Sequence, residues 1–116
     1  MECVKRLLVA DASQEFRCHL VESFQNEPDM EVVGETEDGL QLLELTQKLL
    51  PDVIVMEMVL SGLDGLEVLE RLRGLSLERQ PKILVLSSYV RGSIADLAAA
   101  NGADHYMVKP CLFSTI

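Results

Sequence analysis

The chain has 116 residues, about the length of one domain, and its 48% apolar composition is enough to bury a single core. Aromatic residues make up only 4% of the sequence, so recognition of nucleic acid by base stacking is not expected. The formal net charge of -9 repels nucleic acid and anionic membranes, and it disfavours direct contact of this domain with either.

The cysteines and the N-terminus indicate a cellular compartment. Cys3, Cys18 and Cys111 form an odd set without C-x-x-C spacing, which is typical of free thiols in a reducing compartment rather than of disulfides or a zinc site. No apolar stretch approaches the ~18 residues that span a bilayer, and Asp11 follows too early for a signal peptide. We therefore expect a cytoplasmic protein with no membrane partner.

Strand and helix patterns alternate along the whole chain. Runs of apolar and β-branched residues predict strands, and apolar residues three or four positions apart predict helices. In chain order the patterns predict a strand at 5–10, a helix at 13–25, a strand at 30–36, a helix at 40–50, a strand at 52–56, a helix at 65–75, a strand at 82–88, a helix at 93–101 and a strand at 104–108. Local signals support the helix ends, because Ser13 is a good N-cap, Pro51 stops the second helix and Gly102 ends the fourth.

This alternation predicts the fold class. Strands joined by crossover helices form a parallel sheet that is covered on both faces, and this explains why the strands at 52–56 and 82–88 lack polar alternation. We expect a doubly wound α/β sandwich with five parallel strands. Residues 112–116 are long enough for only the first turn of a fifth helix, so we expect a truncated last helix and a chain that is the N-terminal part of a longer protein.

Polar side chains follow the strands where a ligand site is expected. In open parallel sheets ligands bind beyond the carboxyl ends of the strands, near the point where the strand order reverses. The residues at these ends are Asp11 after the first strand, Glu57 after the third, Ser87 and Ser88 at the end of the fourth, and Lys109 with Pro110 after the fifth. Two acids, two hydroxyls and one lysine are therefore predicted to converge.

This order of residues, with the stretches "DMEVVGETEDGLQLLEL", "PDVIVMEMVLSGLDGLEVLERLR" and "ADHYMVKP", resembles the CheY-like receiver domain of bacterial response regulators. The resemblance covers residues 1–116, and within the family it is nearest to receivers of regulators that initiate sporulation in Firmicutes. It implies a flavodoxin-like, five-stranded parallel sheet of strand order 2-1-3-4-5.

The resemblance also implies a chemistry. Receivers accept a phosphoryl group from a histidine kinase or phosphotransferase onto an aspartate after strand three, with Mg²⁺ bound by acids after strand one. A hydroxyl and an aromatic, here Ser87 and Tyr106, then rearrange and change the face formed by helix four, strand five and helix five. The implied partners are a kinase, a phosphotransferase, the protein's own effector domain, or a second copy at that face. The domain itself is expected to be non-enzymatic.

The match departs from the family pattern at four places: Glu57 holds the phosphoacceptor position, Ala12 replaces the second acid of the pair that begins with Asp11, Leu60-Ser61 replaces Met-Pro, and Ser87 replaces threonine. Glutamate moves its carboxylate one methylene further out, and a misplacement near ~1 Å can cost about a hundredfold in a transfer reaction. Mg²⁺ demands near-octahedral oxygen ligands, so we expect weak or absent binding. With two acids and one lysine the pocket has a net charge of -1, and Lys109 alone could bridge both carboxylates.

Two interpretations of Glu57 stay open. It could stand in permanently for the phosphorylated state by reaching toward Ser87 and Lys109, or a Glu57–Lys109 pair could hold a silent domain in the unphosphorylated shape. Residual phosphorylation is a third possibility, in a receiver that controls a C-terminal DNA-binding domain. A flavodoxin-like cofactor-binding protein is a further alternative, but it needs a phosphate-binding loop after strand one, and "DASQE" has no glycine there.

Each site residue also has a simpler interpretation. Asp11 could cap the following turn, Ser87 could bond its local backbone, and Lys109 could be a solvated surface lysine. Tyr106 could be a half-buried ring with a hydrated hydroxyl. His19 and His105 have no partner at metal-ligand spacing, so we expect neither to bind metal.

Overall fold

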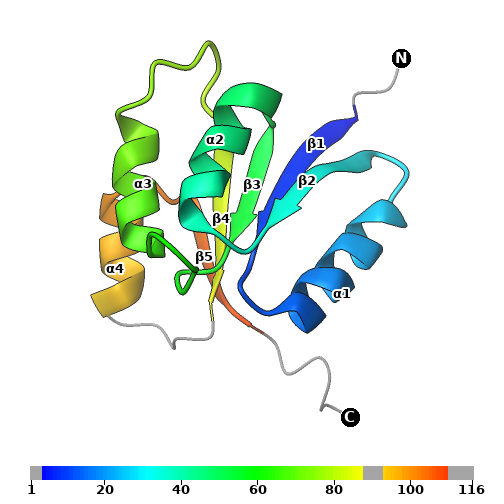
Figure 1. The fold of residues 1–116 in the computed structure, drawn as a ribbon, viewed down its shortest axis with the longest axis horizontal. Helices are drawn as coiled ribbons and strands as arrows, with labels where there is room; N and C mark the ends of the chain where they lie inside the picture. Colours follow the sequence, from blue (N-terminus) through cyan, green and yellow to red (C-terminus); the bar gives the residue numbers. More distant parts are fainter. Residues whose placement is uncertain (1–3, 88–92, 110–116) are drawn as a thin grey trace.

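In the computed structural model, five parallel strands form one sheet in the order β2-β1-β3-β4-β5 (Figure 1). The structure describes residues 4–87 and 93–109. The elements are β1 (Lys5–Ala10), α1 (Gln14–Gln25), β2 (Met30–Thr36), α2 (Gly39–Leu49), β3 (Val53–Met56), α3 (Gly65–Arg73), β4 (Lys82–Ser87), α4 (Ser93–Ala100) and β5 (His105–Val108). The predicted fold class and strand order are therefore confirmed.

The helix ends follow the local chemistry of the sequence. The Ser13 hydroxyl accepts a hydrogen bond from the Phe16 N–H at the start of α1, as an N-cap does. The predicted end of the third helix is wrong by two residues: α3 ends at Arg73 because Gly74 caps it and turns its N–H to the Arg71 carbonyl. Gly102 ends α4 with a φ of 107°, a left-handed conformation that favours glycine.

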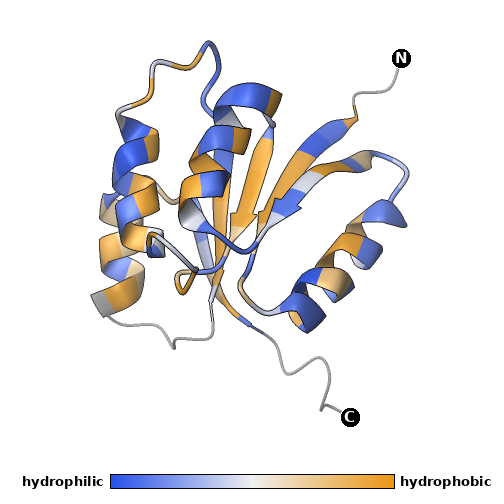
Figure 2. Cartoon of the chain, viewed as in Figure 1, coloured by the Kyte–Doolittle hydropathy of each residue, from blue (hydrophilic) through white to orange (hydrophobic). Residues whose placement is uncertain are grey.

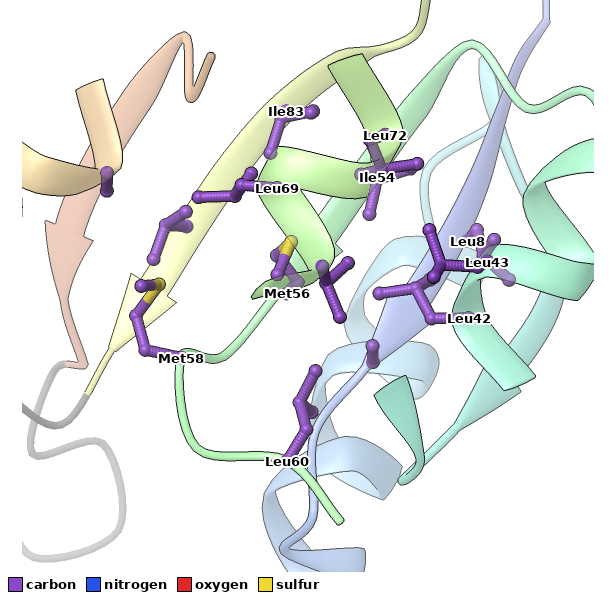
Figure 3. Close-up of a cluster of buried hydrophobic side chains, with 14 residues drawn as sticks. Leu8, Leu42, Leu43, Ile54, Met56, Met58, Leu60, Leu69, Leu72 and Ile83 are labelled. Carbon is purple, nitrogen blue, oxygen red and sulfur yellow. The ribbon is translucent and has the colours of Figure 1, made fainter. Parts of the chain in front are cut away.

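Two apolar layers lie on opposite faces of the sheet. The larger layer joins the sheet to α2, α3 and α4, and Figure 3 shows Leu8 beside Leu43 and Ile54 beside Leu72 within it. The smaller layer lies against α1 and centres on Phe16. Figure 2 shows that β3 is hydrophobic along its length, whereas the helices carry hydrophilic residues on their outer sides. A strand covered on both faces has no reason to alternate apolar and polar residues.

β5 is the less protected edge of the sheet. Met107 is 53% exposed and His105 is also exposed, although both lie on a strand that pairs with β4. The fifth helix expected at 112–116 lies outside the described residues, as do Cys3, Ser88, Pro110 and Cys111. Within the described ranges, no helix has both the length and the apolar character needed to cross a membrane.

Candidate functional site

The pairing of the strands brings the predicted site residues together. Ala10 of β1 pairs with Met56 of β3, so the next residues, Asp11 and Glu57, lie side by side at the carboxyl edge of the sheet. The Glu57 N–H donates a hydrogen bond to the Ala10 carbonyl at 3.0 Å, which fixes this alignment. At the ends of β4 and β5, which are also paired, the Lys109 N–H donates to the carbonyl of Ser87 at 2.6 Å.

Lys109 bridges the two carboxylates, as the charge count predicts. Its Nζ lies 3.0 Å from Asp11 Oδ2 and 3.0 Å from Glu57 Oε1. Asp11 and Glu57 are only 2% and 3% exposed, so the two carboxylates are largely shielded from water. The ammonium also lies 4.3 Å from the centroid of the Phe16 ring, a distance at which a cation is attracted to the ring face. The ammonium is therefore held by two acids and one aromatic ring.

Backbone N–H groups occupy the remaining carboxylate oxygens. Asp11 Oδ1 accepts from the Ser13 N–H at 2.8 Å, so Asp11 caps the turn after β1 as well as pairing with Lys109. Glu57 Oε2 accepts from the Met58 N–H at 2.7 Å and from the Val59 N–H at 3.4 Å. Each of the two carboxylates thus has one oxygen on the lysine and the other on the backbone.

These contacts shift the pKa of two groups in opposite directions. Burial by itself would raise the pKa of Glu57, but the bonds from Lys109, the Met58 N–H and the Ser87 hydroxyl together lower it below its ordinary value of 4.5. Burial would lower the pKa of Lys109, but Asp11 and Glu57 together raise it above its ordinary value of 10.5. Glu57 and Lys109 are therefore both ionised at neutral pH.

A cavity of about 210 Å³ opens onto this network and is lined by Asp11, Ala12, Ser13, Glu57, Val59 and Lys109. Its mouth carries the exposed methyl group of Ala12 where the resemblance implies a second acid. Mg²⁺ prefers about six oxygen ligands in near-octahedral geometry. This cavity offers two carboxylates that already bond an ammonium, and no cluster of three or more His, Cys, Asp or Glu side chains suited to a metal occurs in the described part of the chain.

Of the two residues expected to rearrange, Ser87 contacts the site and Tyr106 lies on β5. Ser87 is fully buried at the end of β4, and its hydroxyl takes part in a hydrogen bond with Glu57. Tyr106 is half-buried and packs against the larger apolar layer. His19 and His105 are exposed, and neither belongs to a metal-binding group of the described residues.

Two contributors were not predicted from the sequence. Phe16 lies in the helix predicted at 13–25, and nothing in the sequence pattern indicates that its ring meets Lys109. Arg17 donates from Nη1 to the Asp11 carbonyl at 2.6 Å and from Nε to Glu35 at 3.0 Å, so it fastens the turn after β1 to the end of β2. The sequence feature that could have indicated the role of Arg17 is its place next to Phe16, near the start of α1. A long side chain at that place can reach the ends of the neighbouring strands.

The site and fold were compared with known proteins. The family model for the response regulator receiver domain matches residues 7–116. Among curated proteins, the chain is 38% identical over 107 residues to protein-glutamate methylesterase/protein-glutamine glutaminase 1 of Methanospirillum hungatei, a match that covers 90% of this chain and 31% of that protein. It is 36% identical over 105 residues to the transcriptional regulatory protein LiaR of Bacillus subtilis, covering 90% of this chain and 48% of LiaR.

Solved structures give the same result. The signal receiver domain of the response regulator NarL from Mycobacterium tuberculosis superposes with a TM-score of 0.87 at 30% identity, covering 97% of this chain and 87% of that one. The response regulator domain of Thermotoga maritima CheB gives a TM-score of 0.85 at 33% identity, with 93% and 80% of the two chains covered. The chain therefore matches receiver domains over nearly its full length, whereas it spans less than half of the curated relatives.

Proposed function

The chain belongs to the response regulator receiver family, and from this membership we propose that it is a two-component signalling module that acts by protein contact, independently of phosphoryl transfer. The observation that carries the proposal is the Lys109 bridge, with 3.0 Å from Nζ to both Asp11 and Glu57. Through this bridge both carboxylates have a cationic partner in the absence of a phosphoryl group or a metal ion. On this proposal the domain is non-enzymatic, and its output depends on the surface that it presents.

The chemistry of phosphoryl transfer supports this proposal. Transfer depends almost wholly on positioning and on compensation of charge by a metal ion. Both oxygens of Glu57 are already engaged, one with Lys109 and the other with the Met58 N–H, and these contacts stabilise the carboxylate and reduce its reactivity as a nucleophile. Asp11 is engaged in the same way, and Ala12 has no oxygen in its side chain. The residues present do not fit Mg²⁺, and we therefore propose that the domain works without a cofactor.

The proposed partners are proteins. A histidine kinase, a phosphotransferase or the effector domain of the same protein would meet the surface around the strand ends or the face of α4 and β5. That face exposes Leu97, Met107 and Val108, which supports a partner or a second copy binding there. Because LiaR is a transcriptional regulatory protein, an effector that binds DNA is the alternative that we propose for a longer chain. The nearer resemblance to regulators of sporulation stays a prediction.

The experiment that tests the proposal is an NMR titration of the ¹⁵N-labelled chain, first with Mg²⁺ and then with beryllofluoride, which mimics an acyl phosphate. The comparison is an Ala12→Asp/Glu57→Asp double variant, with the two single variants as matched controls. We expect no saturable shifts at Asp11, Glu57, Ser87 and Lys109 of the parent chain, and saturable shifts in the double variant. Saturable shifts in the parent that spread to Tyr106 would instead establish a working phosphoacceptor.

The contacts of Glu57 are compatible with both interpretations of this residue, as a permanent stand-in for phosphate and as part of a silent domain in the unphosphorylated shape. Its bonds to Ser87 and Lys109 are those that a permanent stand-in for phosphate needs, and its pair with Lys109 is also the one that a silent domain needs. A Glu57→Gln variant separates the two states. If the parent's Tyr106 signals match those of the beryllofluoride-bound double variant and the Gln variant departs from them, then Glu57 acts as the stand-in. A parent that matches the unliganded double variant is held in the silent shape.

A further inference from the structure

The loop that follows Glu57 is tied to the turn that begins α2. The Ser61 N–H donates to the Glu37 carbonyl at 3.0 Å, and the Gly39 N–H donates to the Ser61 carbonyl at 2.8 Å. These two bonds make an isolated parallel bridge between Asp38 and Ser61, far from each other in sequence. We call this pair of bonds the loop clamp.

Close packing reinforces the loop clamp. Gly62 has a φ of 74°, and a Cβ atom added there would lie 2.9 Å from Asp38 Oδ1. A Cβ atom on Gly39 would collide with the carbonyl oxygen of Leu63. The carboxylate of Asp38 is itself fixed, because it accepts from the Leu40 N–H at 2.7 Å as the N-cap of α2. The turn before α2 and the loop after Glu57 therefore lie so close together that a side chain at Gly39 or Gly62 would collide with the other segment.

The clamped loop is the same one that supplies donors to the acid pocket. It begins with Met58 and Val59, whose N–H groups point at Glu57 Oε2. Its other end is fastened to its start, since the Gly65 N–H donates to the Met58 carbonyl at 2.7 Å. A displacement of the loop centre would consequently move the two donors that hold the Glu57 carboxylate.

We propose that Ser61 is a positioning residue of the acid pocket: its backbone N–H and carbonyl clamp the loop to the α2 turn and so keep the Met58 and Val59 N–H groups on the Glu57 carboxylate. The receiver resemblance puts proline at this position, and proline has no N–H to donate. Serine in place of proline at position 61 thus adds a backbone N–H donor to the loop that follows Glu57, which itself replaces the aspartate of the family pattern. This inference goes beyond the proposed function, because it concerns the metal-free pocket whether or not the domain accepts a phosphoryl group.

The test compares Ser61→Pro with Ser61→Ala in the metal-free chain. Ser61 is exposed and the clamp uses only its backbone atoms, so alanine keeps the clamp whereas proline removes the bond to Glu37. The diagnostic signal is the coupling through the hydrogen bond between the Met58 nitrogen and the Glu57 carboxylate carbon. We expect this coupling to weaken in Ser61→Pro, and the Met58 amide to exchange about threefold to tenfold faster, the effect of losing one net hydrogen bond.

Exchange at Val55 in the core of β3 reports general destabilisation, and the change at Met58 should exceed the change at Val55. If Ser61→Pro does not fold, Gly62→Ala is the second variant, since it keeps the Ser61 N–H but pushes against Asp38, and the same weakening is expected. The proposal is overturned if the coupling and the exchange at Met58 stay at parent values in the folded variant, or if Ser61→Ala changes them as proline does. All readings are taken without Mg²⁺, so metal binding by the parent would refute the proposed function and leave this result standing.

Discussion

Replacing Lys109 by methionine tests the bridge on which the pocket depends. The change removes the ammonium but keeps a long apolar chain beside Phe16, so packing is nearly preserved. It leaves the carboxyl groups of Asp11 and Glu57 nearly unexposed, next to one another and without their shared cation. Removing one partner of a buried ion pair costs about 3–5 kcal/mol, because the remaining charge is buried without compensation. The lysine side chain is 18% exposed, so we expect the lower end, about 3 kcal/mol at neutral pH.

The cost of this change should depend on pH. In the parent chain the pKa of Glu57 is lowered, so its contribution to stability is present above the ordinary value of 4.5 and is lost as the pH falls through the folded-state pKa. The pKa of Lys109 is raised above 10.5, and its contribution is therefore constant over this acid range. Without Lys109 the burial of Glu57 raises its pKa, so protonation on acidification relieves the variant. The difference between variant and parent should shrink from pH 7 to about pH 4.

The assay is urea unfolding followed by far-ultraviolet circular dichroism at both pH values. Lys82→Met, at the exposed first residue of β4, is the matched control and should change the free energy of unfolding by less than about 0.5 kcal/mol. A total stability of about 5–15 kcal/mol makes a loss of this size easy to measure. The reasoning fails if Lys109→Met costs less than about 1 kcal/mol at pH 7, the value of an exposed pair. It also fails if the cost is equal at the two pH values.

Four further substitutions have expected results that urea unfolding can measure. Asp64→Ala removes the N-cap bond that Asp64 Oδ1 accepts from the Glu67 N–H at 3.0 Å, and should cost about 1 kcal/mol. Gly39→Ala should cost about 1–3 kcal/mol because its Cβ atom meets backbone, whereas Gly74→Ala, where the nearest such atom is 3.6 Å away, should stabilise by about 0.4–1 kcal/mol. Ala12→Asp places a third acid at a pocket with one lysine, so it should destabilise the metal-free chain, and added Mg²⁺ should restore the loss.

The sequence predicts the scaffold well because its signals are local. The strand predicted at 52–56 contains the uninterrupted apolar run 53–56, and β3 (Val53–Met56) covers that run without Asp52. The register of the parallel sheet then extends the prediction from the strands to the residues that follow them. Once β1 and β3 are neighbours, the acids that follow them are bound to meet, and this is why Asp11 and Glu57 were placed correctly from strand ends alone.

The contacts that could not be predicted join segments that only tertiary structure brings together. The ring of Phe16 has the spacing of a core residue, and its second contact with the Lys109 ammonium depends on the exact approach of α1 to β5. The Ser61 N–H is invisible in a pattern of side chains, since any residue except proline supplies the same donor. The role of this N–H becomes evident only in the structure, where it donates to the carbonyl of Glu37. Backbone donors and ring faces are therefore the part of this site that sequence reasoning misses.

The substitutions in the pocket are consistent with one another in their charge. A third acid in place of Ala12 would change the net charge of the pocket from -1 to -2, which a divalent cation from solution could neutralise. With two acids, Lys109 satisfies both, and Ser13, Met58 and Val59 donate to the oxygens that it leaves. On the proposed function, the absence of an acid at Ala12 is what allows Lys109 and the backbone donors to bond all four oxygens of Asp11 and Glu57. The same contacts link β1, β3 and the residue after β5 without a phosphoryl group, and this is the physical basis for proposing that the surface of the domain does not depend on a phosphoryl donor.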